Sequence, residues 1–227
     1  REDRRFDREI LSETFTIGLP ALGTTFVSCF GYIAFARMVS GMGTTIFAAH
    51  SIAITAEQIV YIPGYGLRVA TSTLVGNALG EKDIRKLKAT ERVSILITLL
   101  IMVVNGIGLY LFAYPFMRLF TNSVNAARIG SEMLRLVSFS EPFFGLMIVL
   151  EGISYGMGRT KHVFACEAVS MWGIRIFGTF LCVNVFGLGL KAVWLCMIAD
   201  NICKAILLYI FRPKHVEENA DDRGELR

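Results

Sequence analysis

Residues 48–80, AAHSIAITAEQIVYIPGYGLRVATSTLVGNALG, decide the fold class. This stretch is apolar and rich in small residues, yet it contains Glu57 and a Pro63-Gly64 pair. At about 1.5 Å per residue, an unbroken helix of this length exceeds the roughly 30 Å hydrocarbon core of a bilayer. Because of this length, we expect the helix to kink, tilt or protrude. Proline removes a backbone donor, so the freed carbonyls need protein or water partners at membrane depth.

The rest of the chain predicts a membrane protein with several spans. No Asp, Glu, Lys or Arg lies between Glu13 and Arg37, or between Arg92 and Arg118, and each gap is long enough to cross a bilayer. Further apolar stretches, interrupted by single charges, cover about residues 133–157, 163–186 and 188–211. Hydrophobic residues make up 54% of the 227-residue chain.

We therefore predict an all-α, polytopic membrane protein with about six transmembrane helices. Its parts are a charged cytoplasmic arm at residues 1–13, a six-helix transmembrane lobe at residues 14–212 and a polar cytoplasmic tail at residues 213–227. The arm would be a linker to another lobe, because the chain begins at Arg1 rather than Met.

The loops predict the orientation, because short basic loops stay on the cytoplasmic side. Both terminal segments and the connections near Lys86 and Lys161 are rich in Lys and Arg, whereas the connection from Ser40 to Thr44 has no charge. We expect a multi-pass protein of the inner (plasma) membrane with both termini cytoplasmic. The net charge of +4 follows from this bias, so the lipid bilayer is the expected partner and no nucleic acid is.

Cysteine and histidine spacing predicts no metal site. The five cysteines lie in apolar stretches, and the three histidines are far apart. Neither set has the spacing of metal ligands, so we expect the cysteines to pack as small apolar residues. We predict no metal and no cofactor.

A G-x-S-x-G pattern at residues 152–156 raises the possibility of a hydrolase that uses Ser154. That nucleophile needs a strand, a sharp turn and a helix, whereas this segment reads as one apolar helix. Gly152 and Gly156 instead have the spacing that lets two helix backbones approach, as do Gly76 and Gly80. We therefore predict helix packing and no enzyme activity.

Charges inside the predicted spans carry more information, because an unpaired charge in lipid is costly and usually faces a cavity or a partner. Asp200 and Lys204 are spaced for an ion pair within one helix. Glu141 precedes a proline near a predicted helix start, where a carboxylate is favoured. The remaining charges in the spans are Glu57, Arg68, Glu151, Glu167 and Arg175.

Glu57 is the leading candidate for a functional carboxylate. It lies beside Gln58 and four residues before Tyr61, with no basic residue at helical spacing. We predict that Glu57, Gln58 and Tyr61 bind substrate and that Pro63 and Gly64 form a conformational hinge. Protonation and binding of a cationic substrate would then compete at one carboxylate. The alternative is a structural hydrogen-bonding role for Glu57.

Several short motifs together resemble a known family. They are GLP at 18–20, AAH at 48–50, PGYG at 63–66, LVG at 74–76, ALG at 78–80, FTN at 120–122, GMGRT at 156–160 and GLG at 187–189 with Trp194. The combination is similar to the second half of a multidrug and toxic compound extrusion (MATE) transporter, over about residues 10–212. The resemblance implies a two-lobe transporter of about twelve spans that exchanges drugs for sodium ions or protons. This chain would be the C-terminal lobe, with the N-terminal six-helix lobe missing.

Three positions depart from the sodium-coupled branch of that family. Ser28 stands where the branch implies a glutamate, and Phe144 stands where it implies an aspartate, with Ser140 in place of an associated tyrosine. Hard cations need several oxygen ligands, and phenylalanine supplies none. The coupling-ion site, for proton or sodium, is therefore expected outside this chain.

The resemblance predicts a cation-coupled antiporter lobe that exports small amphipathic organic cations. One competing function is that of a flippase for lipid-linked precursors, from the same broad superfamily. It would need more cationic residues than Arg68 and Arg175 to meet a pyrophosphate. A membrane hydrolase that uses Ser154 is a second competing function, and a helical scaffold without transport activity is a third.

Overall fold

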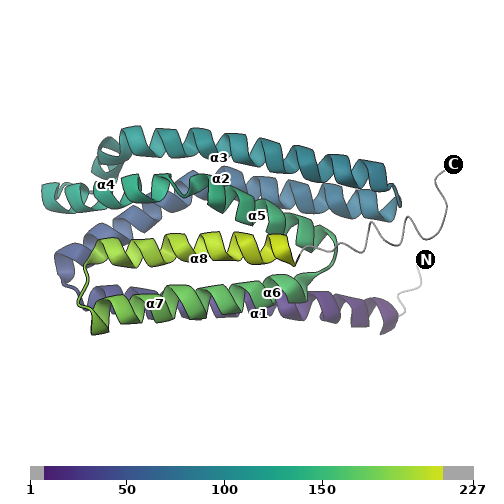
Figure 1. Cartoon of the computed structure of the whole chain (residues 1–227), viewed down its shortest axis with the longest axis horizontal. Helices are drawn as coiled ribbons and strands as arrows, with labels where there is room; N and C mark the ends of the chain where they lie inside the picture. Colours follow the sequence, from purple (N-terminus) through teal and green to yellow (C-terminus); the bar gives the residue numbers. More distant parts are fainter. Residues whose placement is uncertain (1–7, 212–227) are drawn as a thin grey trace, which may run out of the picture.

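The computed structural model describes residues 8–211, and all regular structure in that range is helical (Figure 1). The predicted all-α class is confirmed. The elements are α1 (Arg8–Ser40), α2 (Thr44–Gly80), α3 (Ile84–Phe120), α4 (Val124–Ser138), α5 (Glu141–Gly156), α6 (Thr160–Ser170), the π-helix η1 (Met171–Ile176), α7 (Phe177–Phe180), the π-helix η2 (Leu181–Val185) and α8 (Leu190–Ile210).

Within residues 8–211, five helical segments are long and apolar enough to cross a membrane, and a sixth span results if α4 and α5 count as one. This agrees with the predicted number of about six. The fourth span was predicted as one stretch over residues 133–157, whereas the structure has two helices, α4 and α5, in this region. Helices α4 and α5 meet at an angle of 61° at Phe139 and Ser140, just before Pro142. Pro142 has no backbone N–H to donate to the carbonyl of Ser138, four residues earlier, so α4 does not continue through it, whereas a proline is tolerated in the first turn of α5.

Helix α3 shows how the sequence positions a span in lipid. Asp83 caps its N-terminus by accepting a hydrogen bond from the Lys86 backbone N–H at 2.9 Å. Farther along, large apolar side chains spaced by three or four residues are each more than half exposed: Leu96, Leu100, Val104, Ile107 and Leu111. Such spacing places them on one helix face, where they can contact lipid tails.

Close packing of α5 on α2 explains two of the predicted small-residue positions. A Cβ on Gly152 would lie 2.7 Å from the Arg68 backbone oxygen, and one on Gly156 would lie 2.5 Å from that of Ser72. The glycines therefore let the two backbones approach, as predicted. The second pair behaves differently: a Cβ on Gly76 would meet the Gly156 oxygen at 3.5 Å, whereas one on Gly80 would meet nothing within 4 Å.

The long helix α2 stays helical through Pro63 and changes direction part-way along its length (Figure 1). Asn105 of α3 donates a hydrogen bond from Nδ2 to the Val60 carbonyl oxygen at 3.0 Å, beside the turn that Pro63 disturbs. A protein side chain thus helps to satisfy the backbone at this depth, as an apolar environment requires.

The connections that the basic-residue count places on one side of the membrane do lie together. In Figure 1 the α2–α3 and α5–α6 connections lie at the end of the bundle where α1 begins and α8 ends, while the α1–α2, α3–α4 and η2–α8 connections lie at the other end. The same view shows α1 with α6 and α7 on one side, α2 to α5 on the other and α8 between them. Residues 8–13 of the predicted arm belong to helix α1, whereas residues 1–7 and the predicted tail, 213–227, lie outside the described residues.

Candidate binding cavity

A cavity of about 700 Å³ opens among α1, α2, α5, α6, η1 and α8. Its wall combines aromatic rings with buried charges, three of them acidic and three basic: Glu57, Glu151, Glu167, Arg68, Arg175 and Lys204. Pockets for small molecules are concave and largely apolar, with a few polar groups that fix orientation. This cavity is likewise concave and partly lined by aromatic rings, but its six ionic side chains are more than such pockets usually contain.

Glu57 lies at one part of the cavity wall and is almost fully buried. Tyr61, one turn along α2, donates its O–H to Glu57 Oε1. The Tyr61 ring stacks on Phe144 of α5, with ring centroids 3.7 Å apart and planes 12° from parallel. Gln58 also lines the cavity. The three residues predicted to bind substrate therefore share one wall, and their role in binding stays a prediction.

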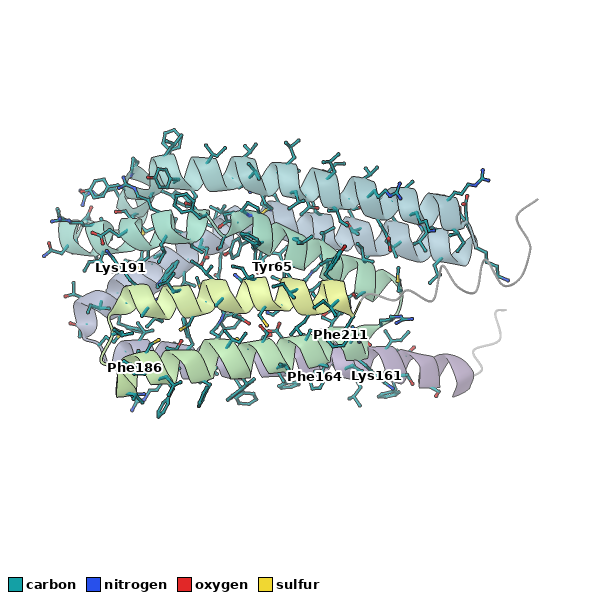
Figure 2. The ribbon with its side chains drawn as sticks, in the orientation of Figure 1. Tyr65, Lys161, Phe164, Phe186, Lys191 and Phe211 are labelled. Atoms are coloured by element: carbon teal, nitrogen blue, oxygen red, sulfur yellow. The ribbon has the colours of Figure 1, made fainter. Side chains whose placement is uncertain are left out.

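Arg68 lies farther along the same helix. Its Nη1 donates to Glu151 Oε2 at 3.1 Å, and its guanidinium lies over the rings of Tyr65 and Tyr155, 5.4 and 6.0 Å from the ring centroids. In Figure 2 Tyr65 lies near the middle of the long axis of the bundle, whereas Lys161 and Lys191 lie toward opposite ends. The sequence-based prediction named Arg68 as a charge within a span and as one of two basic residues that a flippase could use, and it assigned Arg68 no partner.

The charges of α6, η1 and α8 form two buried ion pairs. Lys204 Nζ lies 2.5 Å from Glu167 Oε2, and Arg175 Nε lies 2.8 Å from Asp200 Oδ2. The predicted pair within α8, between Asp200 and Lys204, is therefore wrong. Each residue pairs across helices, since a partner on a packed neighbour is held rigidly while both charges stay away from lipid.

Hydroxyl groups complete the hydrogen bonding around these pairs. Ser28 of α1 donates to Glu167 Oε1 at 2.5 Å, and Ser170 donates to Asp200 Oδ1 and to the Asp200 backbone oxygen. Arg175 lies in η1, where the widened π-helical turn interrupts α-helical geometry. Such turns occur often at functional sites. Sequence reasoning placed Arg175 in a span but gave no signal for the π-helix.

Glu141 differs from the other acidic residues. It begins α5 beside the bend, as predicted, but its side chain is fully buried, and neither carboxylate oxygen has a hydrogen-bond partner among residues 8–211. A Cβ on Gly106 of α3 would lie 3.1 Å from the Glu141 Cβ, so the two helices touch at this point. A buried polar group without a partner is costly, which marks Glu141 as a strained position.

The predicted hinge and the positions that depart from the sodium-coupled pattern have defined neighbours. Gly64 packs near Met102 and Phe144 at ordinary contact distances for a Cβ of 3.5 and 3.6 Å. Ser140 donates its hydroxyl to the Val137 backbone oxygen at 2.8 Å.

Ser154, which the hydrolase alternative requires, donates to the Leu150 backbone oxygen within a continuous helix. Within residues 8–211, no three His, Cys, Asp or Glu side chains are grouped to hold a metal ion.

Comparison with known proteins decides the family. The family model described as MatE matches residues 20–181, more than two thirds of the chain. The chain belongs to the MatE family. A probable multidrug resistance protein NorM of Thermotoga maritima is 30% identical over 201 residues, which cover 88% of this chain and 43% of that protein. The multidrug resistance protein NorM of Aliivibrio fischeri is 26% identical over 165 residues, which cover 73% and 36%.

Solved MATE structures share the fold of this MatE chain. A MATE protein in its bent conformation superposes with a TM-score of 0.88 at 19% identity, covering 97% of this chain and 49% of that one. The bent form of the Vibrio cholerae MATE transporter VcmN gives a TM-score of 0.84 at 16% identity and covers 96% and 49%. The chain thus spans about half the length of the proteins that it matches. The predicted family is confirmed, and the coverage agrees with one lobe of two.

Proposed function

We propose that this chain is the C-terminal lobe of a cation-coupled multidrug efflux antiporter that exports small amphipathic organic cations. The observation that carries the proposal is the cavity in which Glu57 and an aromatic wall face a common space in a chain of the MatE family. Apolar rings with a carboxylate suit a flat, positively charged molecule. The protein would work in the plasma membrane with both termini cytoplasmic.

A second lobe is part of this proposal. The chain covers 43% and 45% of the lengths of two curated relatives. An N-terminal six-helix lobe would supply the other wall, and substrate would bind between the two. Rocking of one helix bundle against the other would expose the site alternately to each side of the membrane. Bending of α2 at Pro63 and Gly64 is the adjustable element in this mechanism.

Proton and sodium remain the two candidate coupling ions, with the site outside this chain. Ser28 and Phe144 occupy positions where the resemblance implies carboxylates, and both have other contacts here: Ser28 donates to Glu167, and Phe144 stacks on Tyr61. Ser28 offers one hydroxyl oxygen in place of a carboxylate and Phe144 offers no oxygen, so these two positions supply fewer ligands than a hard cation needs. No cofactor takes part in the proposed cycle, since transport makes and breaks no covalent bond.

Two competing functions receive less support. A lipid-linked precursor flippase would need excess positive charge to meet a pyrophosphate, whereas three basic side chains in this cavity are balanced by three acidic ones. A hydrolase would need Ser154 on a sharp turn, whereas the residue is buried inside α5 and bonded to its own helix. We therefore propose a transporter and not an enzyme.

Ethidium transport tests the proposal. The full-length protein, meaning this chain with any sequence that the cell attaches to it, is reconstituted into liposomes and given an inward or outward gradient of protons or of sodium. It should move ethidium against its own gradient with one of the two ions, and an ionophore for that ion should stop transport. Residues 1–227 alone should not lower ethidium accumulation in efflux-deficient cells, since one wall is absent. Ethidium movement that ignores both ion gradients would overturn cation coupling.

A further inference from the structure

Arg68 is the most accessible of the paired charges that line the cavity. Its side chain is 33% exposed, whereas those of Glu151, Lys204 and Glu167 are 9%, 8% and 6% exposed. The charge that a molecule entering this lobe can touch most directly is therefore a guanidinium. A site that binds only cations would not need an accessible positive charge in its wall.

The hydrogen bonding of Arg68 leaves room for a ligand. A guanidinium has five N–H donors in a rigid fork, and within residues 8–211 one of them, on Nη1, donates to Glu151. No second hydrogen bond of the Arg68 side chain is formed within residues 8–211, and Arg68 lines the cavity. A carboxylate can take two parallel hydrogen bonds from such a fork, which gives it both strength and orientation.

Aromatic rings surround this guanidinium. Tyr65 and Tyr155 lie beside Arg68, and Tyr65 is 41% exposed. Tyr65 also meets Tyr61 and Phe144 edge to face, at centroid distances of 6.5 and 6.1 Å, so the aromatic wall runs without a break from Arg68 toward Glu57. A flat aromatic substrate can pack along that wall with one end near each charge.

Glu57 and Arg68 share one face of α2. In a straight α-helix, eleven residues amount to three turns with a rotation of only about 20° and a rise of about 16 Å, and Pro63 lies between these two positions of α2. Both side chains line the same cavity. The positive end of an amphipathic molecule near Glu57 would therefore leave its opposite end within reach of Arg68.

We propose that Arg68, flanked by Tyr65 and Tyr155, binds the anionic group, such as a carboxylate, of an aromatic substrate in this cavity. The inference rests on the proposed transport function and names a specificity-determining residue of that site: Arg68 recognises the carboxylate of a substrate that carries one. Arg68 acts by direct contact, and Glu151 holds the guanidinium in place and limits its pull on anions. An ion pair with a purely structural role would instead leave substrate choice unchanged.

A matched pair of dyes tests the proposal. Rhodamine 110 carries a free carboxylate, and rhodamine 123 is its methyl ester, so the two differ only at the group that Arg68 would bind. Their affinities for the purified full-length protein are measured by fluorescence polarisation. Arg68→Gln should weaken rhodamine 110 binding about tenfold or more, the effect of losing a charge-assisted bidentate pair, and should leave rhodamine 123 binding within about twofold. Equal loss for both dyes, or no loss, would overturn the proposal.

Two further variants separate binding from folding. Arg68→Gln leaves the Glu151 carboxylate without its partner. The double variant Arg68→Gln/Glu151→Gln removes both charges of the pair. Its rhodamine 110 binding is compared with that of Glu151→Gln alone. Glu151→Gln should raise rhodamine 110 affinity, and the double variant should lose that gain and fall below the parent. Failure of Arg68→Gln to fold would still leave this comparison decisive. Arg135→Gln is the control, because Arg135 also lies over a tyrosine ring, that of Tyr110, at 6.0 Å, but outside the cavity lining.

The dyes also separate this inference from the transport proposal. If the parent protein binds rhodamine 123 but Arg68 variants bind rhodamine 110 as the parent does, only the anion subsite is wrong. If rhodamine 110 binds through Arg68 and cations neither bind nor move, the subsite stands and cation export is wrong. Farnesyl pyrophosphate, an anion without an aromatic ring, should displace rhodamine 110 no better than 1-naphthoate does at equal concentration. Stronger displacement by the pyrophosphate would overturn the assignment to aromatic substrates.

Discussion

Gly152 of α5 lies so close to Arg68 of α2 that a Cβ at position 152 would be 2.7 Å from the Arg68 backbone oxygen. This contact places Glu151, the residue before Gly152, where its carboxylate meets the Arg68 guanidinium at 3.1 Å. The geometry of the cavity wall therefore depends on a glycine that does not itself line the cavity. The close approach of the α2 and α5 backbones therefore also sets where the Glu151 carboxylate meets Arg68.

Gly152→Ala should destabilise the protein because the added methyl group meets backbone rather than a flexible side chain. Overpacking of about 1–3 kcal/mol predicts a Tm lower by about 3–10 °C in a detergent thermal-unfolding assay. Gly66→Ala, on α2, is the matched control, since a Cβ there has no atom within 4 Å. A Tm for Gly152→Ala equal to that of Gly66→Ala would show that α5 can move away at little cost.

Breaking the buried pair of Lys204 and Glu167 should cost more than replacing both residues. Lys204→Met leaves a buried carboxylate unpaired, at a cost of about 3–5 kcal/mol, whereas Lys204→Met/Glu167→Gln buries no charge and keeps an oxygen to accept from Ser28. The double variant should therefore unfold at a higher temperature than the single one. The same set of two single variants and one double variant, made at the exposed pair of Lys191 and Glu132, is the control.

The buried pair and the exposed pair have distinct expected outcomes in these double-mutant cycles. Variants of the exposed Lys191 and Glu132 pair should each change stability by no more than about 1 kcal/mol, since water screens that pair. Strictly additive losses for Lys204→Met and Glu167→Gln would contradict the ion pair in α6 and α8. They would favour the pairing of Lys204 with Asp200 that the sequence spacing alone suggests.

Glu141→Gln should not destabilise the protein, in contrast to Lys204→Met. Because neither oxygen of the buried Glu141 has a hydrogen-bond partner in the described part of the chain, replacing the carboxyl group with a neutral amide removes a group that is costly to ionise there. We expect thermal stability equal to or above that of the parent, measured in the same unfolding assay. A loss comparable to that of Lys204→Met would show that Glu141 has a partner in the full-length protein.

The sequence was sufficient for features that depend on local pattern. Apolar stretches without charges predicted the spans, and the spacing of Gly152 and Gly156 predicted their contact with another helix. Ion pairing depends on how helices are placed against one another, which spacing along one helix does not encode. Asp200 and Lys204 have a favourable i, i+4 spacing, yet Arg175 and Glu167 on the packed neighbour compete successfully for them.

The candidate site was predictable only in part for the same reason. Glu57, Gln58 and Tyr61 are near in sequence, so they could be grouped from the sequence alone, and they do share one cavity wall. Arg68 and Glu151 are 83 residues apart, and only the packing of α5 on α2 brings them together. The bend between α4 and α5 was predicted only in part: the sequence indicated a helix start near Glu141, but the span was predicted as one stretch from residue 133 to 157.

Membrane topology gives a prediction that the helix arrangement makes sharper. The connections near Lys86 and Lys161 lie at one end of the bundle, and those with Gly43 and Ser123 lie at the other (Figure 1). Single cysteines in a cysteine-free background should label with a membrane-impermeant maleimide from outside at positions 43 and 123 only. Disrupted cells should allow labelling at 86 and 161. Strong labelling of position 86 in intact cells would reverse the predicted orientation.

Glu57→Gln tests whether the Glu57 carboxylate recognises cations. The amide oxygen of glutamine can still accept the Tyr61 O–H, so the substitution removes the negative charge while keeping the hydrogen bond. Ethidium is a permanent cation, so its own charge does not change with pH. Binding to the parent protein should weaken as the pH falls, because protonation neutralises Glu57. The variant should bind ethidium about tenfold more weakly at neutral pH and show a flatter pH profile.

Fluorescence titration of the purified full-length protein from acidic to alkaline pH measures both effects. Glu132→Gln is the control, because Glu132 is an exposed carboxylate that pairs with Lys191 and does not line the cavity. A structural role for Glu57 predicts a lower folding yield, visible in gel filtration, with binding by the folded fraction unchanged. A Glu57→Gln protein that folds normally and binds and exports ethidium as the parent does at every pH would remove Glu57 from both recognition and coupling.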